Sequence, residues 1–491
     1  MEALLSAIAS DLVSRALSMV IQRCGRSKAE ETEKNLQRLQ RVLLRIKASV
    51  EEAERRWITN QAMLRQLDML RQGMYQGNYM LDTFRYRGHS DDNEVSGGRL
   101  VVLPRFSSTK LFFPLPVSDN VKKLEKMLYS LETLMCDMQE FVVFLEGYPR
   151  ICRQPYSTYL ILDKVMFGRQ MEMETVLNFL LRPEAIGDGN PGVLPIVGMT
   201  RVGKSTLVEH VCLDERVRRH FSSIVIFTGG DLGAGNMAAL RGSGVIKHQD
   251  VTAASYGRSL VVIELDEDME EETWTRLYSS AASAMEHGSK IIVTSRSEKI
   301  ASFGTAQALR LKHLPEEAYW YFFKTLAFGS TNPDDQPKLA SLCMEIAATQ
   351  KSSFMGANIL GDVMRANQNA QFWHRLLQCL REIISKHILL FGEHPTYLAQ
   401  KGHPIHMCLL SRAQQHVTIC KIYQDRSLKH IVPKLSLHDI YTGCATDQAK
   451  FRMVAWRSSI PPYYTYLGNC TTHTGRCSMI SKKRPHQMRV S

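Results

Sequence analysis

A short run of residues near the middle of the chain has the types and spacing needed to bind phosphate. Gly198–Ser205 has the pattern GxxxxGKS, follows the apolar run Val193–Val197 and precedes a helical pattern. The two glycines allow a tight turn that brings backbone N–H groups against phosphate oxygens. The helix that starts near Lys204 adds the positive end of its dipole, and Lys204 itself can reach the β- and γ-phosphates. The pattern predicts a nucleotide-binding loop in which the Ser205 hydroxyl ligates Mg²⁺.

A second apolar run, Leu260–Leu265, ends in acids that could hold the water shell of the metal. Glu264 stands where phosphate-loop proteins place their first acid, but Leu265 follows where hydrolytic enzymes often have a second carboxylate. Asp266 comes next, and in a strand its side chain points to the same side as that of Glu264. Glu264 and Asp266 are therefore candidate metal ligands beside Ser205, unless the acids from Asp266 onward form only a solvated turn. We expect weak ATP hydrolysis at most.

A third run, Lys290–Arg296, ends in hydroxyl side chains and an arginine. At the carboxyl edge of a parallel sheet, Arg296 could approach a γ-phosphate and sense its presence. The alternative is a surface arginine at the end of a strand.

The elements that must position these residues are short aliphatic runs separated by helix-length intervals. This alternation is typical of a parallel α/β sheet. The predicted strands are Val193–Val197, Ile224–Phe227, Leu260–Leu265, Ile291–Ser295 and Ala308–Leu311. Helical patterns resume at Glu316–Ala327, Lys338–Met364 and Phe372–Phe391.

Leucine seams dominate the first 150 residues. Apolar residues recur every three or four positions from Leu36 to Val50 and again from Leu124 through Val142 to Leu145. Two more helices are expected around Leu4–Val20 and Met63–Phe84. Four such helices predict a bundle or an antiparallel coiled coil whose seams pack against one another. A face left over could instead bind another protein.

The 491-residue length predicts two to four domains, and the 44% hydrophobic content predicts globular behaviour. No apolar run approaches the length of a membrane span. The eleven cysteines include no CxxC pair, which favours a reduced compartment.

The net charge of +12 belongs to one end of the chain. From Gln371 onward there are 17 Lys and Arg against five Asp and Glu. A region this basic could bind nucleic acid or an acidic membrane surface, although the cluster Lys482–Arg484 could equally be a solubilising tail. No clear period follows Gly392, and we expect the tail from Thr471 to be disordered.

The order of these motifs resembles the plant disease-resistance receptor family, in which a coiled-coil N-terminal domain precedes an NB-ARC nucleotide-binding domain. The segment VMFGR at Val165–Arg169 is similar to the family's linker, and KIIVTSRSEKIA at Lys290–Ala301 is similar to its sensor-arginine segment. Leu314–Gly329 resembles the motif where the α/β part meets a helical subdomain. The family's second and third loop glycines are Thr200 and Arg201 here.

The resemblance implies a multidomain α and α/β protein that binds ADP or ATP with Mg²⁺. Its expected divisions are a helical coiled-coil domain at 1–150, a P-loop nucleotide-binding α/β domain at 151–315, a helical subdomain at 316–391 and a basic, unassigned region at 392–491. The implied nucleotide-binding residues are Val165, Gly168, Arg169, Gly198, Met199, Thr200, Arg201, Val202, Gly203, Lys204, Ser205, Thr206 and Arg296.

The expected function is that of a nucleotide-dependent switch or adaptor in plant defence signalling. Partners would be other proteins bound through the N-terminal helical domain, with self-association as a further option. An intracellular and most simply cytoplasmic location is expected, with a membrane-peripheral or nuclear one as alternatives. No leucine-rich repeat with a period of 20 to 29 residues occurs in the chain, so the resemblance is to a form without these repeats. The alternatives are a degenerate helical scaffold that binds no nucleotide and an active P-loop ATPase.

Overall fold

The computed structural model describes residues 30–86, 117–150, 166–182, 190–228, 245–249, 257–265, 268–408, 415–425, 433–442, 448–460 and 463–474. The helix expected at Leu4–Val20 and the basic cluster Lys482–Arg484 lie outside these residues. The chain divides into two compact units, and each is considered by itself. The first is made of Met1–Leu162, Glu316–Tyr321 and Asp334–Ser341, and the second of Asp163–Pro315, Phe322–Pro333 and Leu342–Ser491.

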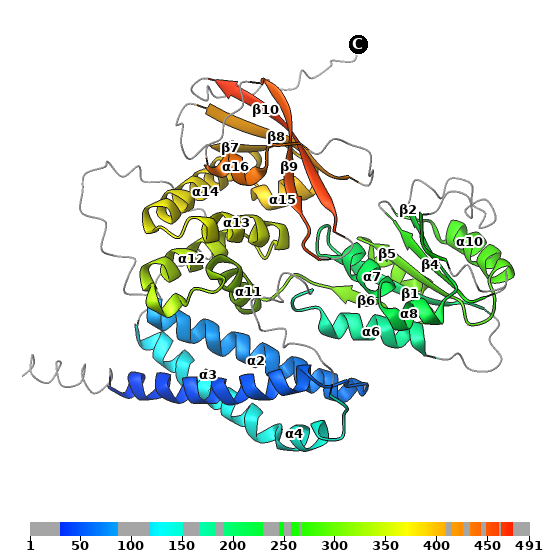
Figure 1. Cartoon of the computed structure of the whole chain (residues 1–491), viewed down its shortest axis with the longest axis horizontal. Helices are drawn as coiled ribbons and strands as arrows, with labels where there is room; N and C mark the ends of the chain where they lie inside the picture. The colour runs from blue at the N-terminus through cyan, green and yellow to red at the C-terminus, as the bar shows by residue number, and fades with distance from the viewer. Residues whose placement is uncertain are drawn as a thin grey trace, which may run out of the picture. The chain divides into compact units, whose positions relative to one another are not determined.

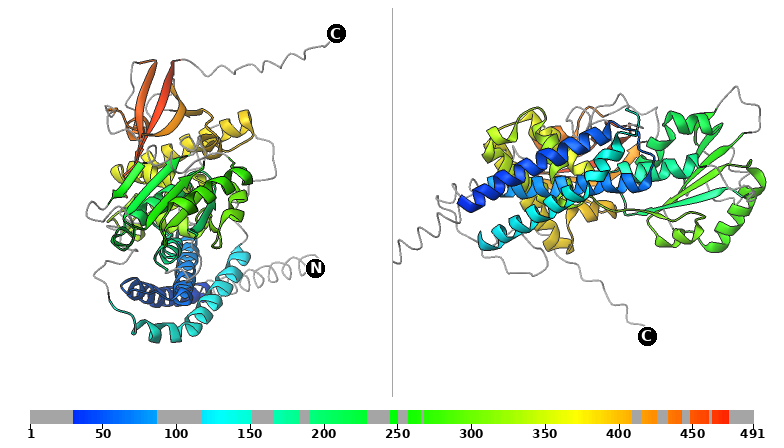
Figure 2. Two further views of the ribbon diagram at one scale, coloured as in Figure 1. Left: turned by 90° about the vertical axis from the view of Figure 1, so that its right-hand side faces the viewer. Right: turned by 90° about the horizontal axis from the view of Figure 1, so that it is seen from below.

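Helices form the first unit, as the leucine seams predict. Residues 30–54 are helical, and they are followed by α2 (Gln61–Tyr86), α3 (Val117–Asp137) and α4 (Gln139–Leu145). Figures 1 and 2 show the blue helices, residues 30–54 and α2, side by side with the cyan α3. Leu39, Ile46 and Val50 of the first seam are 0–1% exposed, so this seam does form the core.

The second seam is interrupted. Its spacing predicts one continuous helix from Leu124 to Leu145, with Val142 on the buried side. Instead, α3 ends at Asp137, α4 begins at Gln139, and Met138 between them has φ −95° and ψ 10°. Phe141 is 0% exposed while Val142 is 45% exposed. The predicted burial of Val142 is wrong because Phe141, three residues after the buried Met138 and four before the buried Leu145, lies on the buried face in its place.

The first unit also holds the start of a much later helix. In α11 (Glu316–Phe328), the indole Nε1–H of Trp320 donates a hydrogen bond of 2.8 Å to Oδ2 of Asp82 in α2, and both side chains are buried. Arg85 and Tyr86, at the end of α2, both bond to the carboxylate of Asp334. Residues 316–321 and 334–341 therefore complete the core of the N-terminal helices, a feature that no local sequence pattern predicts.

A six-stranded sheet organises the first part of the second unit. Its strand order is β3-β2-β4-β5-β1-β6, with all neighbours parallel except β3, which is antiparallel to β2. The strands are β1 (Gly192–Gly198), β2 (Ser223–Thr228), β3 (Val245–Gln249), β4 (Ser259–Glu264), β5 (Lys290–Ser295) and β6 (Leu309–Leu311). All five strands expected from the aliphatic runs are confirmed. The polar edge strand β3, with sequence VIKHQ, is an addition that its composition does not predict.

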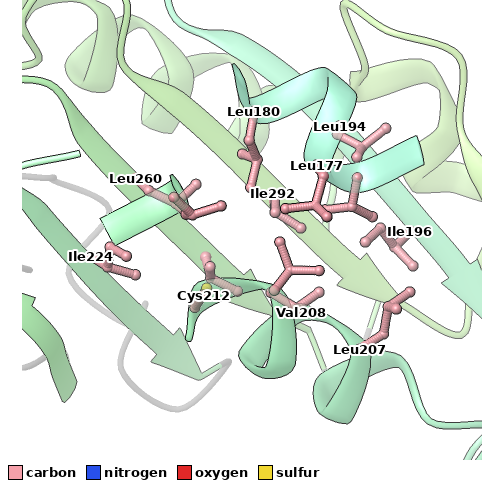
Figure 3. Close-up of a cluster of buried hydrophobic side chains, with 14 of the residues drawn as sticks. Leu177, Leu180, Leu194, Ile196, Leu207, Val208, Cys212, Ile224, Leu260 and Ile292 are labelled. Carbon is pink, nitrogen blue, oxygen red and sulfur yellow. The ribbon is translucent and has the colours of Figure 1, made fainter. Parts of the chain in front are cut away.

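Helices cover both faces of this sheet, which explains why its strands are continuously apolar. The helical elements are α6 (Gln170–Leu181), α7 (Lys204–Cys212), α8 (Glu215–His220), α10 (Glu271–Ala284) and the 3₁₀ helix η3 (Glu298–Phe303). Leu194 and Ile196 of β1 pack with α6 and α7 on one face, as Figure 3 shows. Val193 and Val197 of the same strand belong to a second cluster with Trp274 of α10. The strand that leads into the phosphate loop is thus clamped from both sides.

Further helices follow the sheet. They are the rest of α11, the short η4 (Pro333–Asp335), α12 (Pro337–Thr349), α13 (Phe354–Ala366), α14 (Ala370–Phe391) and α15 (Pro395–Gln400). Of these, α11, η4 and α12 each contribute residues to both units. The helical pattern predicted over Lys338–Met364 is confirmed, but it is divided into two helices. Lys351 and Ser352 adopt positive φ values of 50° and 56°, which end α12, and the Ser353 side chain then caps α13 by accepting from the N–H of Gly356.

The C-terminal region folds into a second sheet. Four antiparallel strands lie in the order β7-β8-β10-β9, where β7 is Ile405–Cys408, β8 Gln415–Asp425, β9 Lys450–Arg457 and β10 Thr465–Thr474. A short helix, α16 (Leu437–Thr442), precedes β9. Figure 1 shows these strands in orange and red. The expectation of disorder from Thr471 is wrong for residues 471–474, which belong to β10, and the rest of that tail lies outside the described residues.

Candidate nucleotide-binding site

The phosphate loop connects β1 to α7 in the predicted strand–loop–helix arrangement. β1 ends at Gly198, and Gly203 immediately before α7 has φ +98°, a conformation that side chains rarely adopt. A Cβ atom at Gly198 would lie 2.7 Å from the carbonyl oxygen of Leu311 in β6. Both glycines of the motif are therefore required, one by its backbone conformation and one by close packing.

Lys204 is held over the loop. Its Nζ donates hydrogen bonds of 2.7 Å to the carbonyl of Gly198 and 3.0 Å to that of Met199. No side chain caps α7, and an α-helix leaves its first four N–H groups without partners inside the helix. The arrangement gathers an ammonium group, the start of a helix dipole and the hydroxyls of Ser205 and Thr206 at one turn of backbone, which suits a phosphate.

Arg201 distinguishes this loop. It has φ +62° although it carries a side chain, and it stands where the resembling family has glycine. Burial lowers the pKa of its guanidinium, and Tyr466 of β10 partly opposes this effect. The loop therefore keeps a glycine-like backbone at Arg201 at a conformational cost of roughly 1 kcal/mol.

The candidate metal acid lies two strands from the loop. β5 separates β1 from β4, so Glu264 at the end of β4 is about 10 Å from the β1 backbone at the usual strand spacing. Glu264 is 7% exposed and lies opposite Thr294 of β5. Within the described residues no group of three or more His, Cys, Asp or Glu side chains could hold a metal by itself. Asp266 lies outside the described residues.

Arg296 follows the last residue of β5 and is exposed. Because β5 lies beside β1, the carboxyl end of β5 comes next to the phosphate loop in the sheet. The Ser295 hydroxyl accepts a hydrogen bond from the N–H of Ser297 and thereby fixes the turn that carries Arg296. This position suits a sensor of bound phosphate, and that role for Arg296 stays a prediction.

Arg169 is buried against the phosphate loop and bonds to protein groups around it. It is 4% exposed, and its Nη1 donates a 2.8 Å hydrogen bond to Glu172, while Nη2 donates to the carbonyl oxygens of Lys312 and, at 3.5 Å, of Val202. Its guanidinium carbon is 5.8 Å from the centre of the Phe354 ring.

Gly168, next to Arg169, has φ +67°, and a Cβ there would lie 2.7 Å from Leu314. The structure thus packs the Gly-Arg pair against the phosphate loop and against the chain that leads to α11. Val165, predicted with this pair, lies outside the described residues.

Glu172 and Phe354 also contact Arg169, and neither belongs to a motif in the sequence. Glu172 lies three residues after Arg169 on the same helix face, a spacing that could have indicated the ion pair. Phe354 offers no sequence signal, because its contact with Arg169 joins segments 185 positions apart.

Comparisons with known proteins agree with this architecture. Residues 8–110 match the model of the Rx N-terminal domain. Disease resistance protein RGA2 of Solanum bulbocastanum is 22% identical over 356 residues, covering 69% of this chain and 35% of that protein. Disease resistance RPP13-like protein 1 of Arabidopsis thaliana is 26% identical over 397 residues, covering 76% of this chain and 37% of that protein. The chain is therefore similar to plant disease resistance proteins and spans about a third of their length.

Among solved structures, a chain in the structure of Drosophila ORC bound to DNA matches with a TM-score of 0.28 and 13% identity, covering 49% of this chain and 76% of that chain. A TM-score this low supports no conclusion. None of the described helices is both long and apolar enough to cross a bilayer.

Proposed function

We propose that the protein binds ADP or ATP with Mg²⁺ at the turn between β1 and α7 and acts as a nucleotide-dependent switch or adaptor in plant defence signalling. The observation that carries the proposal is the placement of Lys204, whose Nζ lies over the loop carbonyls of Gly198 and Met199 beside an uncapped helix start. The similarity to relatives named disease resistance proteins supports the biological setting.

The proposed site takes its phosphate contacts from the loop. The backbone N–H groups from Met199 to Thr206, together with Lys204, would hold the β-phosphate of the nucleotide, and Arg296 would report on a γ-phosphate. Mg²⁺ would be bound by Ser205 and the phosphates, with Glu264 or Asp266 holding its water. Gly168 and Arg169, with the neighbouring Val165, would flank the nucleotide on the side of the following helices.

A switch fits this chain better than a fast enzyme. Leu265, which is only 7% exposed, follows Glu264 at the position where a second acid would polarise the attacking water. A protein that retains its nucleotide can divide its time between two conformations, and a change of nucleotide biases that equilibrium only if the two states bind it differently. Inside the cell, other proteins would bind through the N-terminal helices. A second copy of the chain is a further proposed partner.

The nucleotide content of the purified protein tests the proposal. Gentle purification, denaturation and chromatography of the released nucleotide should give stoichiometric ADP or ATP for the parent and none for Lys204→Ala. The matched control is Lys299→Ala, because Lys299 is a lysine 61% exposed whose Nζ lies 3.1 Å from Asp268, outside the loop. This control should keep its nucleotide.

Two results would favour the other functions. A parent protein that stays empty after incubation with ADP and with ATP in the presence of Mg²⁺ would indicate a helical scaffold. Turnover of ATP at about 1 s⁻¹ or faster would indicate an ordinary P-loop ATPase.

A further inference from the structure

Arg169 occupies an unusual position for a residue expected to bind nucleotide. Only 4% of it is exposed, and protein groups already occupy both of its Nη atoms. A guanidinium this deep is costly unless its charge is paired and its donors are bonded. Glu172 pairs the charge of Arg169 and both Nη atoms donate to protein groups, while its buried Nε has no hydrogen-bond partner among the described residues. Its partners therefore indicate what it does.

These partners come from three segments that are far apart in the sequence. One is Val202 in the phosphate loop, whose carbonyl accepts from Nη2 at 3.5 Å. The second is Lys312, whose carbonyl accepts from the same nitrogen just after β6 and four residues before α11. The third is Phe354, the first residue of α13, whose ring lies 5.8 Å from the guanidinium carbon.

Further contacts make the same region stiff. Leu314 packs against Gly168 so closely that a methyl group there would lie 2.7 Å away. The ring of Phe322 stacks on Phe167 at 5.0 Å and meets Phe354 edge-on at 5.6 Å. Glu172 supplies the countercharge to Arg169 at 2.8 Å from within α6. A displacement of the Val202 carbonyl therefore changes a hydrogen bond of the Arg169 side chain, which also contacts Lys312 and Phe354.

We propose that Arg169 is a positioning residue rather than a nucleotide ligand, and that its guanidinium ties the phosphate loop to the chain entering α11 and to the start of α13. Phosphate binding reorients the loop peptides so that their N–H groups face the anion. Because the Val202 carbonyl moves with these peptides, the hydrogen bond to Arg169 tightens or breaks as the nucleotide comes and goes. Residues 309–315 and the start of α13 then report the state of the loop. Only this nucleotide-dependent part rests on the proposed function.

Arg169→Lys tests the proposal by keeping the positive charge beside Glu172 while losing the planar fork that bridges two carbonyls. The matched control is Arg216→Lys at α8, where Arg216 forms a 2.8 Å ion pair with Asp214 and lies outside these segments in the sequence. Glu172→Gln is a milder second variant, which keeps a hydrogen-bond acceptor and removes the countercharge.

The first measurement is hydrogen exchange of the full chain without nucleotide. Loss of a charge-assisted hydrogen bond should speed exchange about tenfold in all three segments, 199–203, 309–315 and 353–361, in Arg169→Lys, and less in Glu172→Gln. Arg216→Lys should leave these segments unchanged. Faster exchange confined to residues around 169–172 would overturn the proposal, whether or not the protein binds nucleotide.

The second measurement adds fluorescent ADP with Mg²⁺. With ADP at saturation, Arg169→Lys should lose the ADP-induced protection of 309–315 and 353–361. A loss of affinity of about 100-fold would make Arg169 a direct ligand and overturn the proposal. Full retention of the ADP-induced protection would overturn it as well. A parent that binds no nucleotide would remove the proposed function and leave the first measurement to decide on the link.

Discussion

We expect His394 to lower the free energy of unfolding of the protein in mild acid. It is the N-cap of α15, where its Nδ1 accepts a hydrogen bond of 3.3 Å from the backbone N–H of Thr396. Burial is the main cause that lowers the pKa of His394 from 6.5 to about 4. The charge of Lys351 and, to a smaller extent, His387 add to it, while the carbonyl of Thr349 opposes. Protonation of Nδ1 would turn the cap's acceptor into a donor that faces an N–H group, at the positive end of a helix.

The size of the effect follows from the two pKa values. A group whose pKa is lower in the folded state binds protons more weakly there, so stability is complete above pH 6.5 and is lost as the pH falls towards 4. With pKa values of 6.5 unfolded and about 4 folded, His394 costs about 2 kcal/mol at pH 5 and about 3.4 kcal/mol well below pH 4.

Urea unfolding of the parent and of His394→Asn at pH 7 and pH 5 measures this contribution. Asparagine also caps helices but does not titrate, so the variant keeps the N-cap and removes the proton. The buried His387, whose pKa burial also lowers, is present in both proteins, and its repulsion of a charged His394 exists in the parent alone and is part of the measured difference. Between pH 7 and pH 5 the parent midpoint should fall by about 1 M urea more than that of the variant, for a slope of about 2 kcal/mol per M. Equal shifts in the two proteins would refute the assignment of the low pKa to His394.

Two core substitutions in the first unit should also destabilise the protein measurably. Gly77→Ala would place a methyl group 2.5 Å from Leu43 and should cost about 1–3 kcal/mol through overpacking, seen as a lower thermal midpoint; an unchanged midpoint would contradict the tight approach of these helices. Trp320→Phe keeps the ring but removes the donor to the buried Asp82 and should cost about 1–3 kcal/mol in urea unfolding. The half-buried Trp456 is the control, because Trp456→Phe keeps a stack on Tyr466 and should cost less.

The phosphate loop was predictable because its requirements are local. A buried strand, two glycines and a helix start within Val193–Thr206 place Lys204 and Ser205 without help from the rest of the chain. The same holds for the other parallel strands, whose aliphatic runs need only helices on both faces. The contacts of Arg169 could not be predicted in this way, because its bonds to Val202 and Lys312 join residues 33 and 143 positions apart. A motif could identify the residue but not its partners.

Helix interruptions limit what periodicity predicts. At Met138 the helix is interrupted, and the spacing of apolar residues fits both Phe141 and Val142 on the buried face, of which only Phe141 is buried. At Lys351 and Ser352 two residues with positive φ divide a stretch whose composition is helical throughout. Neither position has glycine or proline, the residues that usually mark such a break in a sequence. Tertiary packing stabilises the unusual backbone conformation, and the spacing of apolar residues does not report this packing.

The composition of the C-terminal region does not predict its four-stranded sheet, and β10 shows why. Thr465–Thr474 is rich in Thr, with Gly468 and Asn469 in its middle, so it lacks the alternation of a typical strand. The register shifts at Tyr466/Leu467 against β9 and at Asn469/Cys470 against β8, and the extra residues are Ala455 of β9 and Cys420 of β8, so the two partner strands carry the irregularities. Yet β10 is the central partner of β8 and β9, so both edges of its backbone are paired, and Gly468 lets Met453 cross it closely. Order in this strand comes from backbone pairing on both sides, and a polar composition by itself therefore does not predict a disordered end.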